Sequence, residues 1–414
     1  MIFLTKNIII LKPHIMKKII LGALALMFGA IGFAQTNNDG QINQVGQSND
    51  GTIAQDGLLN VATIDQFGTN LADVKQTGNE NNANVDQGSA ANPVTNVITT
   101  YHTSGAWIEQ IGNDNDASII STQEGGNAYN SGNGNAGSIY QNGNDNEASQ
   151  LLQSHTSKRA STSARVAVEI DQLGNDNEAH QRTRANFGSY GIQQMWVDQI
   201  GNNNYANQYS NGGMQSVMTV KQTGSNNSNA TTADVSSTGL ASPLSMAWGT
   251  KMHPANSGGI PSGQISGGVY TQYQNGRYSI ATIDVEGDDN KTTQAQEFTV
   301  WGASGDNEAT IDIIGDRNAV IQGQMGEINV SHVDVTGDDN VVTTGQEGDS
   351  NMADVDVMGN WNVGAIVQTG DAHEAVIWQS GDNNFGTITS DGNNHFGSIN
   401  QTGNMNNAVI TQQN

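Results

Sequence analysis

Glutamine and asparagine side chains recur at fixed intervals in this sequence, where they could form hydrogen-bonded columns. Asn60, Ala62, Ile64 and Gln66 are two residues apart and would share one face of a β-strand. An amide buried without a partner is costly, but identical amides stacked one strand apart pair with one another. We therefore predict inward-facing amide ladders made of Gln44, Asn49, Gln55, Asn60, Gln66, Gln324, Asn340, Gln346, Asn351, Gln368, Gln401 and Asn406.

Aspartates gather near the predicted turns, where their oxygens could bind calcium. Calcium takes several oxygen ligands, and stacked turns could supply them. The sequence lacks the G-G-x-G-x-D pattern of calcium-loaded solenoids. We instead expect solvated turns that keep the protein soluble, with neither a metal nor a cofactor, at Asp114, Asp145, Asp176, Asp288, Asp289, Asp338, Asp339 and Asp382.

A few other side chains could support chemistry. His373 and His395 are 22 residues apart, and two adjacent imidazoles could hold a metal, but no third ligand is evident. Substitution at a tolerant turn position explains both histidines. Trp107, Trp196 and Trp378 should point outward, where they could bind sugars or another fibril, or simply be covered by an insertion. No nucleophile paired with a base can be recognised, so we predict that the protein is not an enzyme.

Glycines set the frame that would position these side chains. They recur every 11 residues over long stretches, and an asparagine follows three residues later in most units. Glycine can turn the chain there without steric cost. Each unit should therefore contain one short strand and one tight turn. The predicted turn glycines are Gly46, Gly57, Gly68, Gly315, Gly326, Gly337, Gly348, Gly359, Gly370, Gly381, Gly392 and Gly403.

Two such units should form one rung, because a single strand cannot close a coil. Two residues before the glycines, Ile313 and Val335 alternate with Gln324 and Gln346, so the true period is 22 residues. We predict an all-β fold, a β-solenoid of about 22-residue strand-turn-strand-turn rungs that form two facing parallel sheets with loop insertions. Roughly 14 rungs would stack ~4.8 Å apart. Thr343 should face outward, where a small change would have little effect.

The first 34 residues resemble a targeting segment. Lys17 and Lys18 precede an apolar run, and small residues lead to Ala34. Cleavage there would remove four of the 15 basic residues and leave 11 against 40 acidic ones, a net charge of −29. That charge argues against nucleic acid and anionic lipid as partners. Without cysteine there is no disulfide framework. We expect an exported protein whose mature chain does not insert into a membrane.

The mature chain divides by the regularity of its repeats. Residues 35–87 and 282–414 contain regular repeats, whereas 88–281 contain repeats with long insertions. In the middle region the intact turn glycines are 31, 31, 27 and 23 residues apart. All four prolines of the mature chain fall within insertions, as expected because proline would remove a hydrogen bond between strands.

The insertions should leave the rod in an ordered way. One turn of each rung stays short, so we expect the insertions to cluster on one edge, among them Gln153–Ala164 and Thr183–Ser189. The longest insertion, roughly residues 236–279, is expected to be a hinge or a break in the rod.

The repeat Q-x-G-x2-N-x-A-x3-Q resembles the curlin repeat of curli amyloid fibres. The motif is complete in the units Gln55–Gln66 and Gln401–Gln412, and the resemblance covers most of residues 41–414. It implies a secreted subunit that folds into a β-solenoid and polymerises into fibres of a biofilm matrix. It also implies two partners, a nucleator subunit and an outer-membrane secretion pore.

Two functions are compatible with the sequence. In the first, the chain is a structural fibre subunit that assembles head-to-tail with other copies through the open ends of the solenoid. Repeats begin near the predicted cleavage site and continue to Gln412, without a capping element in the sequence. In the second, the chain is a monomeric surface adhesin that presents its insertions.

Overall fold

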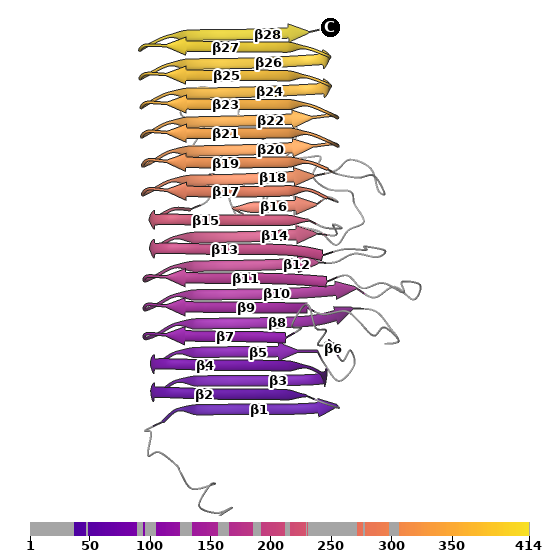
Figure 1. Cartoon of the computed structure of the whole chain (residues 1–414), viewed down its shortest axis with the longest axis vertical. Coiled ribbons are helices and arrows are strands. Elements are labelled where there is room, and N and C mark those ends of the chain that lie inside the picture. Colours follow the sequence, from indigo (N-terminus) through magenta and orange to yellow (C-terminus); the bar gives the residue numbers. More distant parts are fainter. Residues whose placement is uncertain are drawn as a thin grey trace, which may run out of the picture.

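A computed structural model describes most of the repeat region, in residues 37–46, 49–88, 94–95, 105–124, 135–155, 165–184, 192–211, 216–228, 230, 271–275, 278–297 and 306–413. Within these ranges the chain forms 28 strands and no helix, stacked into one rod (Figure 1). None of the described residues forms a helix that could span a membrane. The predicted leader lies outside these ranges, as do the four prolines of the mature chain.

The strands form two parallel sheets, and the chain alternates between them. Sheet A has 15 strands: β1 (Asp39–Gly46), β3 (Val61–Thr69), β5 (Asn82–Gln87), β6 (Val94–Thr95), β8 (Asp116–Glu124), β10 (Glu147–His155), β12 (Glu178–Arg184), β14 (Tyr205–Asn211), β16 (Gln272–Asn275), β18 (Lys291–Glu297), β20 (Ala319–Met325), β22 (Val341–Glu347), β24 (Val363–Asp371), β26 (Phe385–Asn393) and β28 (Asn407–Gln413). Sheet B has 13 strands: β2 (Asp50–Leu58), β4 (Leu71–Asn79), β7 (Gly105–Ile111), β9 (Asn135–Asn142), β11 (Arg165–Leu173), β13 (Ile192–Asn202), β15 (Val217–Ser225), β17 (Ile280–Glu286), β19 (Glu308–Ile314), β21 (Val330–Thr336), β23 (Met352–Met358), β25 (Glu374–Ser380) and β27 (Phe396–Thr402).

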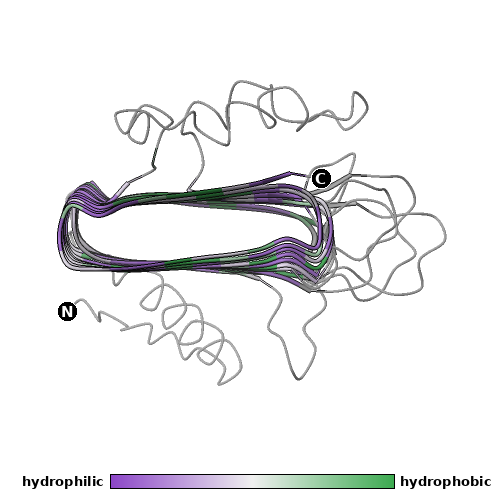
Figure 2. Cartoon of the chain, turned by 90° about the horizontal axis from the view of Figure 1, so that it is seen from above, coloured by the Kyte–Doolittle hydropathy of each residue, from purple (hydrophilic) through white to green (hydrophobic). Residues whose placement is uncertain are grey.

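Each rung is one strand of sheet B, a turn, and one strand of sheet A. Seen along the stack, the rungs form a flattened coil whose long sides are the two sheets (Figure 2). In the C-terminal region Val335 pairs with Val357 in sheet B, and Gln324 pairs with Gln346 in sheet A, both 22 residues apart. The predicted solenoid of two facing parallel sheets with strand-turn-strand-turn rungs is therefore confirmed.

The core lies between the two sheets and consists of small aliphatic and amide side chains. Asn60, Ala62, Ile64 and Gln66 are all fully buried, whereas Val61 between them is 41% exposed. This alternation follows from the two-residue period of a strand, which places every second side chain inside the coil. Aliphatic side chains pack along the middle of each rung, and amides lie toward the rung ends.

One part of the outer surface is apolar and buried. On sheet A, the outward side chains of β14 to β20 form an apolar cluster that includes Tyr209, Tyr273, Ala295, Ile321 and Met325. Each is at most 5% exposed, although no described strand stacks on this face. Nearer the C-terminus of the same sheet, the outward side chain of Val409 is 62% exposed. Thr343 also faces outward here, but it is only 1% exposed rather than freely solvated.

Most insertions leave the rod where a strand of sheet A connects to the next strand of sheet B. β10 ends at His155 before β11 begins at Arg165, and β12 ends at Arg184 before β13 begins at Ile192. Both connections therefore begin at the same edge of the rod, whereas most of Gln153–Ala164 and Thr183–Ser189 lies outside the described residues. The connections from sheet B to sheet A stay short for most rungs, because they contain the Gly-x2-Asn turn.

The longest insertion is the exception, because its flanking residues contradict an exit at the edge and a break in the rod. Most of its own residues lie outside the described ranges. The chain leaves the rod not at the edge but partway along the position that one strand occupies in sheet A. The N–H of Ala230 donates to the carbonyl of Thr292 on β18. Two residues further along β18, the N–H of Gln294 donates to the carbonyl of Thr271. The chain thus leaves the sheet after Ala230 and re-enters it at Thr271. The sheets are not broken here, because β16 pairs with both β14 and β18, and β15 pairs with β17.

Candidate functional site

Buried glutamines form continuous hydrogen-bonded ladders along the rod. Gln324 Nε2 donates to Gln346 Oε1, and Gln346 Nε2 donates to Gln368 Oε1, both over 3.0 Å. The second N–H of Gln346 donates to the carbonyl of Val330 on the facing sheet, 3.0 Å away. Each amide therefore links its own column and also links the two sheets. Similar bonds connect Gln44 to Gln66, Gln66 to Gln87, Gln55 to Gln76, and Gln379 to Gln401.

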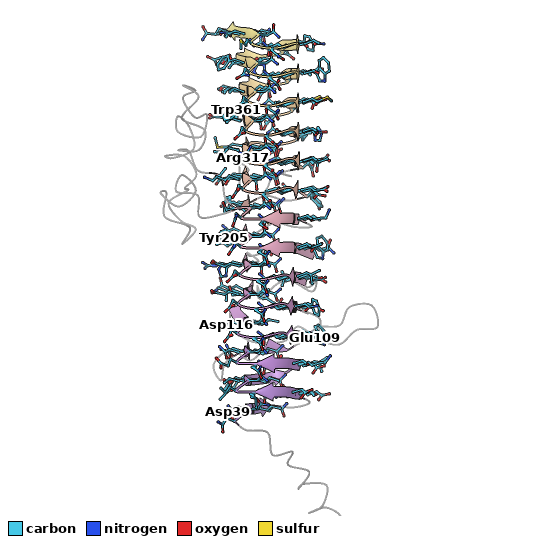
Figure 3. The ribbon with its side chains drawn as sticks, turned by 90° about the vertical axis from the view of Figure 1, so that its left-hand side faces the viewer. Asp39, Glu109, Asp116, Tyr205, Arg317 and Trp361 are labelled. Carbon is cyan, nitrogen blue, oxygen red and sulfur yellow. The ribbon has the colours of Figure 1, made fainter. Side chains whose placement is uncertain are left out.

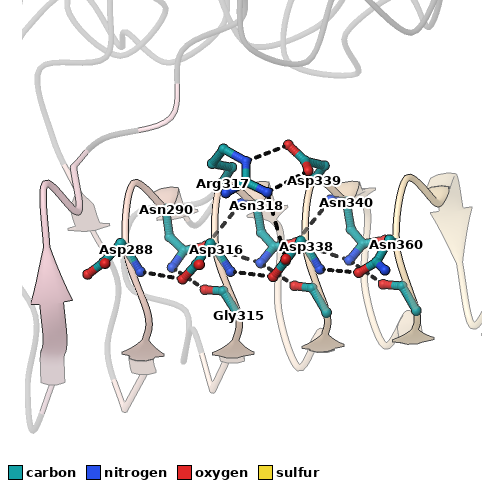
Figure 4. Close-up of polar contacts among 12 residues, drawn as sticks. Asp288, Asn290, Gly315, Asp316, Arg317, Asn318, Asp338, Asp339, Asn340 and Asn360 are labelled. Atoms are coloured by element: carbon teal, nitrogen blue, oxygen red, sulfur yellow. Dashed lines mark hydrogen bonds and ion pairs between the residues drawn. The ribbon is translucent and has the colours of Figure 1, made fainter.

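Asparagines form a second kind of ladder at the turns. The amide of Asn340 donates to Asn318 Oδ1 over 3.1 Å and to the carbonyl of Gly359 over 2.8 Å, while its own N–H bonds the same Asn318 oxygen (Figure 4). Asn60 makes equivalent bonds to Gly78 and from Asn81, as do the other turn asparagines Asn351 and Asn406 within their columns. At the N-terminal end, Asn49 Oδ1 accepts from the N–H of Asn70.

The Asp or Asn after most turn glycines forms a third ladder that the sequence analysis missed. Asp316 Oδ1 accepts the N–H of Asp288 over 2.9 Å, and Asp338 Oδ1 accepts the N–H of Asp316 over 3.0 Å (Figure 4). Asn360 continues the column by accepting from Asp338. These carboxylates cap backbone N–H groups, which corrects the expectation that Asp288 and Asp338 are only solvated. The signal was present, because Asp or Asn follows successive turn glycines on this edge.

The turn glycines are stacked so closely that no side chain fits between them. Gly337 has φ of 126°, and a Cβ built on it would lie 2.1 Å from the carbonyl oxygen of Gly359. Gly57 has the same conformation, with φ of 122°. Gly46 and Gly68 are register partners in β1 and β3, as Gly57 and Gly78 are in β2 and β4.

His373 and His395 occupy the asparagine column on the other edge. Their rings stack with centroids 5.2 Å apart. The N–H of His395 donates to His373 Nδ1 over 3.2 Å, so the proton of His373 resides on Nε2, which donates to the carbonyl of Thr369. Both nitrogens of His373 are thus used within the ladder. Among the described residues no group of three or more potential metal ligands is found.

The outward face of sheet B carries an acidic stripe. Its register column contains Asp171, Asp198, Lys221, Asp284, Asp312, Asp334, Asp356 and Trp378. Burial raises the pKa of Asp171, and the neighbouring Asp198 raises it further. Burial also raises the pKa of Asp356, with a further contribution from Asp334. Like charges stacked directly opposite one another repel, so this stripe lowers the stability of the folded rod.

Aromatic side chains on the exterior are scattered rather than gathered. Trp107, Trp196 and Trp378 all point outward and are half-buried, as their positions in the strands predict. Trp361 lies at the turn edge and is 60% exposed. Figure 3 shows it along the same side of the rod as Arg317. No described cluster of these rings suggests a sugar-binding platform.

A comparison with protein families matches part of the C-terminal repeats. Residues 359–392 match the family model of the curlin associated repeat, and the matched range begins and ends at turn glycines. No curated protein matches the chain. The Gln, Gly, Asn and Ala positions of that repeat are the ones that build the ladders, turns and core described above. Residues 359–392 are therefore similar to the curlin associated repeat.

Proposed function

We propose that this protein is a secreted structural subunit of curli-like extracellular amyloid fibres, which serve in a biofilm matrix and in adhesion. Copies would join head-to-tail through the open ends of the solenoid. A nucleator subunit and an outer-membrane secretion pore are the expected partners. The observation that carries the proposal is the open hydrogen-bonding edge at each end of the rod.

Neither end of the rod is closed by a described strand. β1 pairs only with β3, and β28 pairs only with β26. The N–H of Phe385 in β26 donates to the carbonyl of Asn406, and Phe385 is the register partner of Asn407. In a parallel ladder the N–H groups of Asn407 and of every second residue after it therefore face the open edge. Such an edge is a template for another chain.

The side chains at the ends are also incomplete. Ile42, which faces the core of the first rung, is 42% exposed, whereas its register partner Ile64 is fully buried. The amide ladder has a direction, because each Nε2 donates to Oε1 of the next rung. Gln412 at the upper end would therefore donate to Gln44 of the next copy. Burial of Ile42 and completion of the ladder both favour head-to-tail stacking.

The positions of the terminal strands also limit the strength of the contact between two copies, here called a joint. Both terminal strands belong to sheet A, so stacking β1 on β28 leaves one strand position empty in sheet B between β27 and β2 of the next copy. A heterologous joint of this kind does not close on itself, and it gives a filament. Each joint would be weaker than an internal rung, so shear should cut filaments into whole numbers of subunits.

Sedimentation and electron microscopy of the chain from residue 35 onward, across a salt series, test the proposal. We expect filaments that form faster as salt rises, because salt screens the repulsion of a strongly acidic chain. Val409→Pro removes an N–H at the open edge of β28 and should block growth there, whereas Val409→Thr should not. Equal growth of the two variants would contradict assembly through this edge. A protein that stays monomeric at every salt concentration would favour the adhesin.

A further inference from the structure

On the outward face of sheet A, a serine, a histidine and a glutamate are linked by two consecutive hydrogen bonds. Ser149 Oγ lies 2.6 Å from His180 Nδ1, and His180 Nε2 lies 2.7 Å from Glu178 Oε1. Ser149 and His180 are register partners on the neighbouring strands β10 and β12. Glu178 and His180 are two residues apart on β12, so the strand period places both on the same face.

The hydrogen-bond chemistry fixes the role of each group. An ionised carboxylate can only accept, so the proton on the ring of His180 resides on Nε2 and is donated to Glu178. Nδ1 then carries a lone pair, and Ser149 donates its hydroxyl proton to it. This is the arrangement of a nucleophile, a general base and an orienting carboxylate. It is independent of the ladders, which use the opposite face of the same strands.

The site is open to solvent. The side chain of His180 is 26% exposed and that of Glu178 is 44% exposed. Its titratable and charged neighbours are Glu147 on β10, Arg182 on β12 and Tyr205 on β14, whose ring lies edge-on to His180 with centroids 6.2 Å apart. No lysine or arginine contacts the imidazole in the described contacts, which leaves Nδ1 available as a base.

We propose that Ser149, His180 and Glu178 form an esterase site for small activated esters. Ser149 Oγ attacks the carbonyl carbon of the ester while its proton passes to His180 Nδ1. The imidazolium then donates that proton to the departing alcohol oxygen, which leaves an acyl group on Ser149. Water attacks this acyl ester with His180 again as base, and the acid leaves as the proton returns to Oγ. Ester and water thus give an acid and an alcohol.

The expected rate is modest. Backbone N–H groups of β10 and β12 are used in the ladder between strands, so the flat sheet supplies no pair of N–H groups aimed at a developing oxyanion. The acceleration then rests on general-base catalysis, which contributes about 10²-fold at its lower limit. In the described hydrogen bonds the carboxylate of Glu178 contacts only His180, so Glu178 is a positioning residue. The activity does not depend on filament formation, because the site lies in the middle of the rod.

Hydrolysis of p-nitrophenyl acetate by the chain from residue 35 onward tests the proposal. Ser149→Ala and His180→Gln should each lower the enzyme-dependent rate by about 10²-fold. Ser118→Ala is the matched control, because Ser118 is the partner of Ser149 on β8 and lacks the imidazole. It should keep the wild-type rate. Diisopropyl fluorophosphate should label Ser149 and not Ser118 in peptide mass mapping.

A second pair of variants separates positioning from a merely structural role. Glu178→Gln can place a donor or acceptor against Nε2 and so frees the ring to change tautomer, whereas Glu178→Asp keeps the carboxylate. We expect Glu178→Gln to lower kcat and leave KM unchanged, and Glu178→Asp to restore kcat in part. A wild-type rate in Ser149→Ala, or a label elsewhere than Ser149, would overturn the proposal.

Discussion

The regular C-terminal region and the insertion-rich middle region share one interior and differ in their exteriors. In the C-terminal region, ladder glutamines such as Gln324 and Gln346 are 22 residues apart. In the middle, the bonds from Gln110 to Gln141 and from Gln172 to Gln199 span 31 and 27 residues. All are close to 3 Å long. Extra chain length thus leaves the ladder unchanged, because lengthening a surface loop costs little free energy.

The difference between the regions lies on the outward faces and the edges. The middle region carries the Ser149–His180 pair and the apolar cluster that contains Tyr209 and Tyr273. Glu297, on β18 at the start of the C-terminal region, is also buried, at 5% exposed. The last strands of the C-terminal region instead present exposed side chains such as Val409. The interior therefore specifies the fold in both regions, and the exterior is free to acquire chemistry. The predictions below test whether the two interiors are equivalent.

The largest effect should come from a side chain placed on a stacked turn glycine. Gly337→Val in the C-terminal region and Gly174→Val in the middle would drive Cβ into the next glycine, whose oxygen lies 2.1 Å and 1.8 Å from it. A branched residue is also strained at positive φ. We expect each change to cost about 4 kcal/mol or more, measured by thermal unfolding of the soluble protein.

Gly40→Ala provides the control for this pair. Its nearest neighbour would lie 3.4 Å from the new Cβ, which is ordinary contact, and its register partner is already Ala62. It should leave the unfolding midpoint nearly unchanged. If Gly174→Val were tolerated and Gly337→Val were not, the turns of the middle region would be more adaptable than the shared ladder implies.

The second effect concerns the glutamine ladder. Gln346→Leu and Gln172→Leu keep bulk inside the coil but remove the amide, so neighbouring groups lose a partner and each change should cost ~1–3 kcal/mol. Thr387→Ser on an outward position should have little effect. Denaturant unfolding measures all three variants. Similar losses for the two glutamines would confirm one interior, and a loss confined to Gln346 would show that insertions relax the ladder.

The sequence predicted the interior well and the exterior poorly, for a physical reason. The two-residue period of a strand and the repeat of a rung both leave marks in the sequence, so the residue pattern alone places Gln346 inside the coil and Gly337 at a turn. Contacts across the outer face depend on which strands are neighbours after an insertion. Ser149 and His180 are 31 residues apart, a separation that has no meaning until the insertion between them is set aside. The turn aspartates were misread because a carboxylate suits both water and a backbone N–H.

The third prediction uses the buried carboxyl of Glu297 on β18, where the C-terminal region begins. Burial raises the pKa of Glu297 to about 7 from an ordinary 4.5, while a hydrogen bond with Asn275 lowers it. The folded state therefore holds the proton more tightly than the unfolded chain does. Its stabilising contribution is complete below about pH 4.5 and is lost as the pH rises through about 7.

Unfolding measured from pH 4 to pH 8 tests this sign. The wild type should lose about 3 kcal/mol relative to Glu297→Gln over that range. Glu347→Gln provides a comparison on the neighbouring rungs, since Glu347 also ends a sheet A strand but is half-buried. A wild-type protein that gained stability relative to Glu297→Gln as the pH rose would show that Glu297 is charged in the folded state.

The smallest effect should come from the exposed ion pair of the C-terminal turns. Arg317 donates to both carboxylate oxygens of Asp339, over 2.9 Å and 2.8 Å. Because the pair is solvated and screened by salt, Arg317→Gln should leave the unfolding midpoint within experimental error. Asp338→Ala, one residue away, removes the acceptor of the Asp316 N–H and should lower the midpoint clearly. A double-mutant cycle with Asp339→Asn measures the ion pair alone. If Arg317→Gln lowered the unfolding midpoint as much as Asp338→Ala, ion pairs rather than capping of backbone N–H groups would stabilise these turns. The solvated turns of the middle region would then be less stable than those of the C-terminal region.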